Sequence, residues 1–179
     1  MLGDASMTDA ERERLMSWMS GEDVLDEDGD VSTTSRTSMA DPLHSKPIVF
    51  THSGTAANPD LTLLFGTNDG HFRAVNAADG VQRWSFIPPE LLPVSKILYD
   101  NVTPIHPYGV DGAPVLWVND PDFDGATIDL SGTDNFAYVY FGMRRGGRNY
   151  YALDVTDICL LYTSPSPRDL STSRMPSSA

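Results

Sequence analysis

Aspartates at alternate positions are the residues of this sequence with the clearest chemistry. The run from Asp120 to Gly125 places carboxylates at Asp120, Asp122 and Asp124 and a glycine at its sixth position. Calcium takes roughly six to eight oxygen ligands, and a run of this kind can wrap one loop around the ion. The twelfth-position acid of an EF-hand falls on Ser131, so the pattern departs from that motif. We predict a calcium site here, with a solvated acidic turn as the alternative.

A second acidic segment lies nearer the N-terminus. Residues 21–30 hold six carboxylates, among them those of Asp26, Asp28 and Asp30. Counted from Asp26, Gly29 is at the fourth position instead of the sixth, which weakens the calcium pattern. Acidic runs are usually solvated, so we interpret this segment as a flexible acidic linker, with calcium binding as the alternative.

Residues for catalysis are not grouped by any pattern in the sequence. Gly-x-Ser-x-Gly, His-Glu-x-x-His and phosphate-loop motifs are absent, and the four histidines have no metal-ligand spacing. We expect His44 to be a hydrogen-bonded structural residue. Three arginines surround a Gly-Gly pair in a turn, and we interpret them as a solvated hairpin loop or a contact for an anionic partner: Arg144, Arg145 and Arg148. We therefore predict that the protein is not an enzyme.

The composition restricts the kinds of partner. The chain has 179 residues, with 25 acidic and 12 basic side chains and a net charge of −13. Such a chain repels phosphate, so we exclude nucleic acid as a partner. No apolar run reaches the roughly 18 residues of a membrane span. Cys159 is the single cysteine, so neither an intrachain disulfide nor a thiolate metal cluster forms. Residues 1–9 lack the features of a signal peptide, and we interpret the chain as an internal fragment.

The elements that must position these residues begin with a short helix over residues 8–20. Thr8 and Glu11 match a capping box, and Gly21 suits the left-handed C-terminal cap. An apolar stripe that includes Trp18 must dock on another element, because so short a helix is marginal alone. We assign residues 1–40 to this helix and the acidic linker.

A repeated β pattern follows. The first unit predicts strands over 47–51, 61–67, 71–76 and 81–87. The second unit repeats the first three over 113–117, 137–143 and 149–154. Both units contain a strand ending in Phe-Gly and then an aromatic-x-Ala-x-Asn/Asp strand. Repeated four-stranded units favour a mainly β chain forming a partial β-propeller of about two blades over 41–157, with a generic antiparallel sheet as the alternative.

The last part of the chain, residues 158–179, lacks this pattern. It has no alternation, and no tryptophan where the first unit has Trp84, so the fourth strand of the second unit is expected to be missing. The segment resembles translated sequencing-adapter sequence, and we interpret it as a non-native tail. A natural disordered tail is the alternative.

Several motifs in order resemble one known family. They are Asp41-Pro-Leu-His-Ser-Lys-Pro47, Gly66-Thr-Asn-Asp-Gly70, Ala74-Val-Asn-Ala-Ala-Asp-Gly80, Ile87-Pro-Pro-Glu-Leu-Leu92, Tyr108-Gly-Val-Asp-Gly112 and Gly146-Gly-Arg-Asn-Tyr-Tyr-Ala-Leu-Asp-Val155. Over residues 8–157 the chain resembles the C-terminal domain of the type IV pilus tip adhesins, the PilC/PilY family. Single motifs recur in other propellers, including quinoproteins, whereas the ordered set is more specific.

The resemblance implies a modified, quinoprotein-like propeller in a large protein that is exported through the periplasm to the cell surface or pilus tip. It implies a secreted fimbrial adhesin and pilus assembly factor that supports pilus extension, retraction and surface attachment. Its partners would be minor pilins and surface or host receptors. Calcium binding is a family trait. The family's loop usually carries an acid at its ninth position, where this sequence has Ile128, and Asp129 follows one residue late. The predicted calcium ligands are therefore Asp120, Asp122, Asp124 and Asp129.

Two other functions are left open by the sequence. The first is a dehydrogenase that uses pyrroloquinoline quinone and calcium, which Trp84 and the blade pattern permit. Such enzymes typically use a disulfide between adjacent cysteines, and this sequence has no cysteine outside the tail. The second is a non-catalytic propeller scaffold of the outer membrane, which needs neither calcium nor a pilus.

Overall fold

The computed structural model describes residues 7–32, 34–36, 38–102, 106–120, 135–157 and 162–163. Most of these residues belong to two antiparallel sheets of four strands each. The strands of the first sheet are β1 (Ile48–Gly54), β2 (Pro59–Gly66), β3 (Phe72–Asn76) and β4 (Gln82–Phe86). Those of the second are β5 (Val115–Asn119), β6 (Phe136–Gly142), β7 (Tyr150–Asp154) and β8 (Tyr162–Thr163).

Both sheets are simple meanders, in which each strand pairs with its neighbours in the sequence. The prediction of a mainly β chain is thereby confirmed. Two tight turns of the first sheet form where the sequence predicts them, and their glycines, Gly70 and Gly80, have φ values of 94° and 76°. A residue with a Cβ is disfavoured at such angles, so these two glycines direct the chain into the next strand.

The strand β8 corrects one expectation. The fourth strand of the second unit was expected to be missing, but Tyr162 and Thr163 pair with Asp154 and Leu153 of β7. The segment has no hydrophobic alternation, so periodicity gave no signal for it. Backbone pairing requires no particular side chains, and two residues suffice for this short contact.

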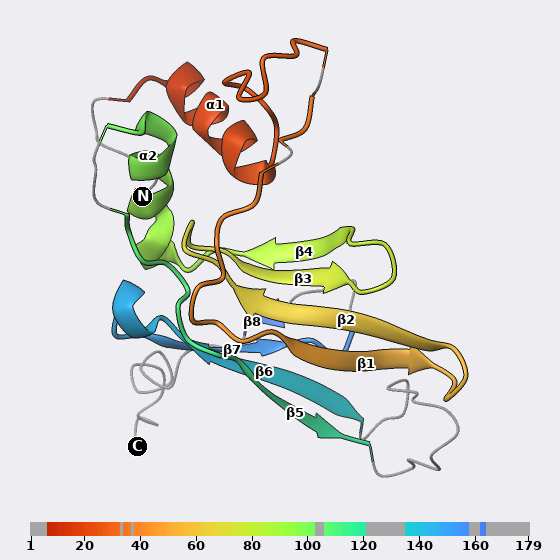
Figure 1. Ribbon diagram of the computed structural model, residues 1–179. Coiled ribbons are helices and arrows are strands. Elements are labelled where there is room, and N and C mark those ends of the chain that lie inside the picture. Colours follow the sequence, from red (N-terminus) through yellow and green to blue (C-terminus); the bar gives the residue numbers. More distant parts are fainter. Residues whose placement is uncertain are drawn as a thin grey trace, which may run out of the picture.

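Figure 1 shows that the two sheets form two layers. The hydrophobic core contains buried side chains of both sheets. Phe72 of β3 and Phe141 of β6 stack across the layers, with ring centroids 4.1 Å apart and ring planes 3° apart. Apolar side chains of both sheets surround this pair, among them Phe50, Leu64, Val139 and Leu153, all buried. The core is therefore formed by the contact between the two sheets. Each sheet buries its core-facing side chains against the other sheet.

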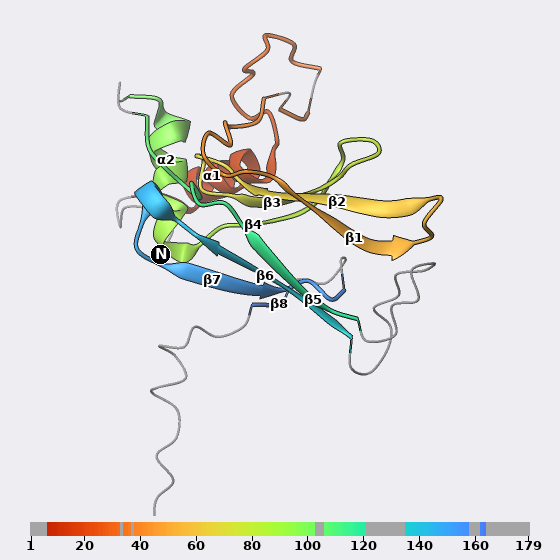
Figure 2. The same ribbon diagram turned by 60° about the horizontal axis from the view of Figure 1, so that its bottom comes forward.

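Two helices lie together at one end of the sheets (Figure 2). The first, α1 (Asp9–Ser20), has the predicted capping box: the Thr8 hydroxyl accepts from the Glu11 N–H, and the Glu11 carboxylate accepts from the Thr8 N–H. Gly21 ends this helix in the left-handed conformation, with φ of 102°. The predicted helix and both of its ends are confirmed.

The second helix, α2 (Leu92–Asp100), was not predicted from the sequence. It follows a single 3-10 turn, η1 (Pro89–Leu91), and it begins with a proline in its first turn, where a missing N–H is tolerated. In the sequence, the prolines at 88 and 89 indicate only the end of the preceding strand. The helix packs beside α1, where Trp18 and Tyr99 meet edge to face at 5.7 Å between ring centroids.

Candidate functional site

The predicted calcium loop falls largely outside the described residues. Asp120 follows directly after β5 and is partly buried. Asp122, Asp124 and Asp129 lie outside the part of the chain that the structure describes. The calcium site after β5 therefore stays a prediction.

A carboxylate cluster is present in the acidic segment instead. Carboxylate oxygens of Asp23, Asp26 and Asp28 all lie within 4.8 Å of one another. The sequence pattern groups Asp26 and Asp28 with Asp30, whereas in the structure Asp23 completes the cluster. Asp26 adopts a left-handed φ of 53°, and Gly29 a φ of 74°, so the chain turns back on itself here. Asp26 and Asp28 are exposed and Asp23 is partly buried, and the three carboxylates offer oxygen ligands of the kind that calcium takes, so the residues fit a hard cation.

The acidic segment is attached to α1 through Glu27. The indole N–H of Trp18 donates to Glu27 Oε1 at 2.8 Å, and Arg36 Nε lies 3.0 Å from the same oxygen. The Arg36 guanidinium also covers the Trp18 ring, 4.1 Å from its centroid, and the Ser38 hydroxyl donates to the other Glu27 oxygen. Burial raises the pKa of Glu27, but these donors and the Arg36 charge outweigh it and lower the pKa. The segment around the aspartate cluster is thus fixed at one point.

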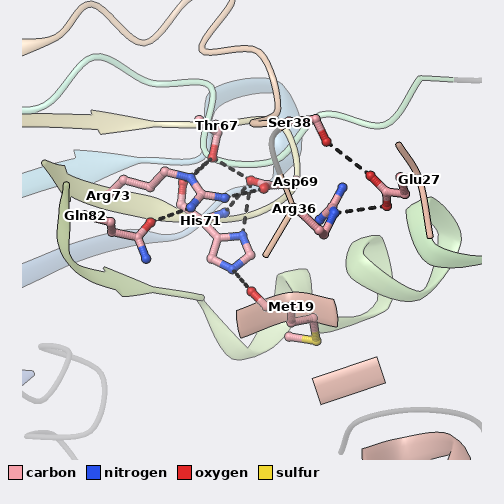
Figure 3. Close-up of polar contacts among 9 residues, drawn as sticks. All are labelled: Met19, Glu27, Arg36, Ser38, Thr67, Asp69, His71, Arg73 and Gln82. Carbon is pink, nitrogen blue, oxygen red and sulfur yellow. Dashed lines mark hydrogen bonds and ion pairs between the residues drawn. The ribbon is translucent and has the colours of Figure 1, made fainter. Parts of the chain in front are cut away.

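A buried polar network joins the same helix to the first sheet (Figure 3). His71 lies at its centre: Nε2 is 3.2 Å from the carbonyl oxygen of Met19 in α1, and Nδ1 is 3.2 Å from Asp69 Oδ1. Arg73 binds the other oxygen of Asp69 at 2.5 Å, and the Thr67 hydroxyl donates to Asp69 Oδ1 at 2.5 Å. The β2–β3 turn is therefore held by charge as well as by backbone geometry.

Asp69 is the group whose ionisation this network controls most strongly. Burial by itself raises the pKa of the carboxyl, since the charged form loses water. The contact and charge of His71, the charge of Arg73 and the Thr67 hydroxyl outweigh burial and lower the pKa of Asp69 far below its ordinary value. Local sequence pattern does not reveal this network, because it indicates only a turn at Asp69 and because Met19 is distant in sequence.

A third polar cluster connects the two repeats. His44 Nδ1 lies 2.7 Å from Oδ1 of Asp111, whose side chain is fully buried. The expectation that His44 is hydrogen-bonded is confirmed. Arg144, exposed and with a left-handed φ of 50°, lies 3.6 Å from the second oxygen of Asp111. His44 and Asp111 stand at matching positions, each three residues before the proline that precedes β1 or β5. The cluster fixes the starts of the two sheets relative to each other.

The other arginines of the turn after β6 have different surroundings. Arg145 donates to the Tyr108 hydroxyl at 2.9 Å and lies over its ring, while Arg148 is exposed. The three arginines predicted as a group therefore do not converge on one point in the structure. No helix among the described residues is long and apolar enough to cross a membrane.

The fold and these clusters define a mainly β protein of two packed antiparallel meanders, with an acidic segment held against a terminal helix. In comparisons with known proteins, the chain matches no family, no curated protein and no solved structure.

Proposed function

We propose that the chain is part of a modified β-propeller of a type IV pilus tip adhesin and assembly factor of the PilC/PilY family, modulated by calcium. The observation that carries this proposal is the structural repetition of the two sheets. β1–β4 and β5–β8 have the same strand order, and the second sheet packs on the first as a successive unit. Successive four-stranded meanders packed face to face are the arrangement of propeller blades.

The motifs that carry the family resemblance support the proposal by their positions. The segments 41–47 and 108–112 precede β1 and β5, and their residues His44 and Asp111 bind each other. The turns 66–70 and 142–149 follow β2 and β6 in the same way. Two of the motifs, 41–47 and 108–112, thus stand in equivalent places of the two repeats.

Calcium has two candidate positions in this proposal. The first is the loop after β5, with Asp120, Asp122, Asp124 and Asp129 as ligands, and the second is the cluster of Asp23, Asp26 and Asp28. A single ion at either position would neutralise part of the net charge of −13. Binding to the native state alone would raise the melting temperature through mass action.

The calcium part is tested by titrating Ca²⁺ into the full chain while following tryptophan fluorescence and the thermal melt. Two double variants locate the site: Asp122→Ala with Asp124→Ala, and Asp26→Ala with Asp28→Ala. We expect a saturable rise in melting temperature that one of the two variants abolishes. A folded wild-type chain that shows no response at millimolar Ca²⁺ would contradict the proposal.

The pilus part needs a separate measurement, because a calcium-binding propeller could serve elsewhere. Immobilised chain is exposed to purified minor pilins of a type IV pilus, with a major pilin as the control. We expect saturable binding of a minor pilin only. Absence of binding would favour the outer-membrane scaffold, and an absorbance change on titration with pyrroloquinoline quinone would favour the dehydrogenase.

A further inference from the structure

One imidazole ring joins the helix α1 to the first sheet, and both of its nitrogens face oxygen atoms (Figure 3). Nε2 of His71 lies 3.2 Å from the carbonyl oxygen of Met19 in the last turn of α1, and Nδ1 lies 3.2 Å from Asp69 Oδ1. The His71 side chain is only 4% exposed. Little water reaches the ring, so the two oxygens act on it with little screening.

The number of protons on this ring decides whether both contacts are favourable. A neutral imidazole has one N–H and one bare nitrogen with a lone pair. With the proton on Nε2, the ring donates to Met19 but turns a lone pair toward the Asp69 carboxylate. With the proton on Nδ1, the lone pair faces the Met19 carbonyl oxygen instead. Only the charged imidazolium places an N–H toward each of the two oxygens.

Asp69 acts on Nδ1 as a charge more than as a hydrogen-bond acceptor. Among the described residues, Nδ1 of His71 has no partner with hydrogen-bond geometry. Asp69 Oδ1 already accepts from the Thr67 hydroxyl and from the backbone N–H of His71. The Asp69 side chain is 8% exposed, so its charge is felt strongly at 3.2 Å. A cation is attracted at this position, whereas a lone pair is repelled.

The other charged groups on the neighbouring elements have partners of their own. Arg73 of β3 binds the second oxygen of Asp69 and so shares that carboxylate with His71. The charged side chains of α1, η1 and α2 contact other groups or solvent: Arg12 pairs with Asp9, Arg14 donates to the Val24 carbonyl, Glu11 caps Thr8, Glu13 is exposed, Glu90 binds Asn149, and Lys96 pairs with Asp100. Met19 lies at the carboxyl end of α1, where the partial negative charge of the helix also attracts a cation.

The remaining contacts that hold α1 do not depend on pH near neutrality. Leu15 and Trp18 are buried apolar side chains, and the Trp18 ring meets Tyr99 of α2 edge to face. The acidic segment follows α1, because the Trp18 indole donates to Glu27 at 2.8 Å. A change at His71 would therefore act on the helix and on the acidic segment together.

We propose that His71 is a pH-sensitive latch: its imidazolium, held between Asp69 and the carboxyl end of α1, fastens α1 and the attached acidic segment to the first sheet, and loss of its proton loosens them. Because the docked helix needs the proton, docking is strongest at acidic pH and weakens as the pH rises through about 6–7, where histidines ordinarily lose it. Asp69 stays charged over this range, since its pKa is far below it. The latch does not depend on the pilus or on calcium.

The test is amide hydrogen exchange of the full chain at about pH 5.5 and about pH 8.5, on either side of the ordinary histidine range, with each rate corrected for the intrinsic effect of pH. Amides of residues 15–20 report the opening of α1, and those of β3 (Phe72–Asn76) report the opening of the first sheet. We expect the protection of α1 to fall about tenfold more than that of β3 between the lower and the higher pH, as the charged contact at the helix end is lost.

Two variants separate this histidine from the others. His71→Gln keeps an N–H donor near the position of Nε2 but cannot take up a second proton, so the protection of its α1 should be the same at both pH values. His106→Gln is the matched control, because His106 is exposed and pairs with Asp41 instead of α1. It should keep the whole wild-type drop.

A second measurement needs no variant. Nuclear magnetic resonance of the imidazole nitrogens in the wild type at about pH 5.5, below the ordinary histidine range, shows which of them carry protons. We expect an N–H on both nitrogens of His71, and a ring with a single N–H would overturn the proposal. Protection of α1 that does not change with pH, or that falls only as much as that of β3, would overturn it as well. So would a folded His71→Gln chain that retains the wild-type drop.

Discussion

At the scale of single residues, the side chains that hold the molecule together are those whose partners are distant in sequence. Asp111 and His44 are 67 residues apart, and His71 and Met19 are 52 apart. Sequence reasoning could predict that His44 is hydrogen-bonded, because a lone histidine with no metal-ligand spacing usually is. It could not predict the partner, since that depends on how the two repeats pack.

The lowered pKa of Asp69 gives a pH prediction. A carboxyl whose pKa is lower in the folded state than in the unfolded chain stabilises the fold above the unfolded value of roughly 3.9 and loses that contribution as the pH falls further. We expect the melting temperature to drop steeply below about pH 4. Asp69→Asn should be less stable at pH 7 and should lose less stability on acidification than the wild type, as thermal melts from pH 7 to pH 2.5 would show.

The control for this prediction is Asp79→Asn, a change in an exposed turn carboxylate. It removes the same charge from the chain without touching Thr67, His71 or Arg73. If Asp79→Asn flattens the acid transition as much as Asp69→Asn does, the loss reflects general charge and the buried network does not cause it.

At the scale of elements, the sequence predicted what local pattern determines and missed what packing determines. Capping chemistry predicted α1, and alternation and turn residues predicted the seven strands β1 to β7 to within a few residues. The helix α2 was missed because its Pro-rich start looks like a stop, and β8 because its pairing depends on β7 and not on its own residues. The candidate metal cluster was found only in part, since Asp23 joins it through the turn at Asp26.

The attachment of α1 is tested by Trp18→Phe. Phenylalanine keeps most of the buried ring but removes the N–H that donates to Glu27 at 2.8 Å, leaving that carboxylate one donor short. We expect the free energy of unfolding to fall by about 1–3 kcal/mol, measured by urea denaturation. Trp117→Phe at the exposed tryptophan is the matched control and should change it by less than about 0.5 kcal/mol. Equal effects of the two changes would contradict the attachment.

The two equivalent glycines that end β2 and β6 give a second test at this scale. A Cβ on Gly66 would lie 2.2 Å from the backbone oxygen of Val110, whereas a Cβ on Gly142 would meet only the exposed ring of Tyr150, at 2.9 Å. A backbone atom cannot give way, but a surface ring can. We expect Gly66→Ala to destabilise the chain by about 1–3 kcal/mol or more and Gly142→Ala to be nearly neutral in the same urea measurement. A reversed order would show that the close approach of Val110 is unimportant.

At the scale of the whole molecule, the repeat is what the sequence predicted best, because corresponding residues of the two units occupy corresponding strand positions. What the repeat could not predict is that equivalent residues have opposite environments. Phe72 and Tyr150 stand at the same register position, yet Phe72 is fully buried and Tyr150 is 83% exposed. The difference arises because the second sheet covers the face that carries Phe72, whereas the face that carries Tyr150 is exposed. Burial thus depends on how the two sheets pack and not on the repeated sequence alone.

The same pair shows whether the two sheets unfold together. Phe72 stacks on Phe141 of the other sheet, so Phe72→Ala removes a ring that both layers share. We expect a loss of about 3–5 kcal/mol, with fluorescence and far-ultraviolet circular dichroism following one coincident transition. Tyr150→Ala should leave the stability unchanged within about 0.5 kcal/mol, because the Tyr150 side chain is 83% exposed. Separate transitions for the two probes would instead show that each sheet is stable alone, and the contact between sheets would then contribute little to folding.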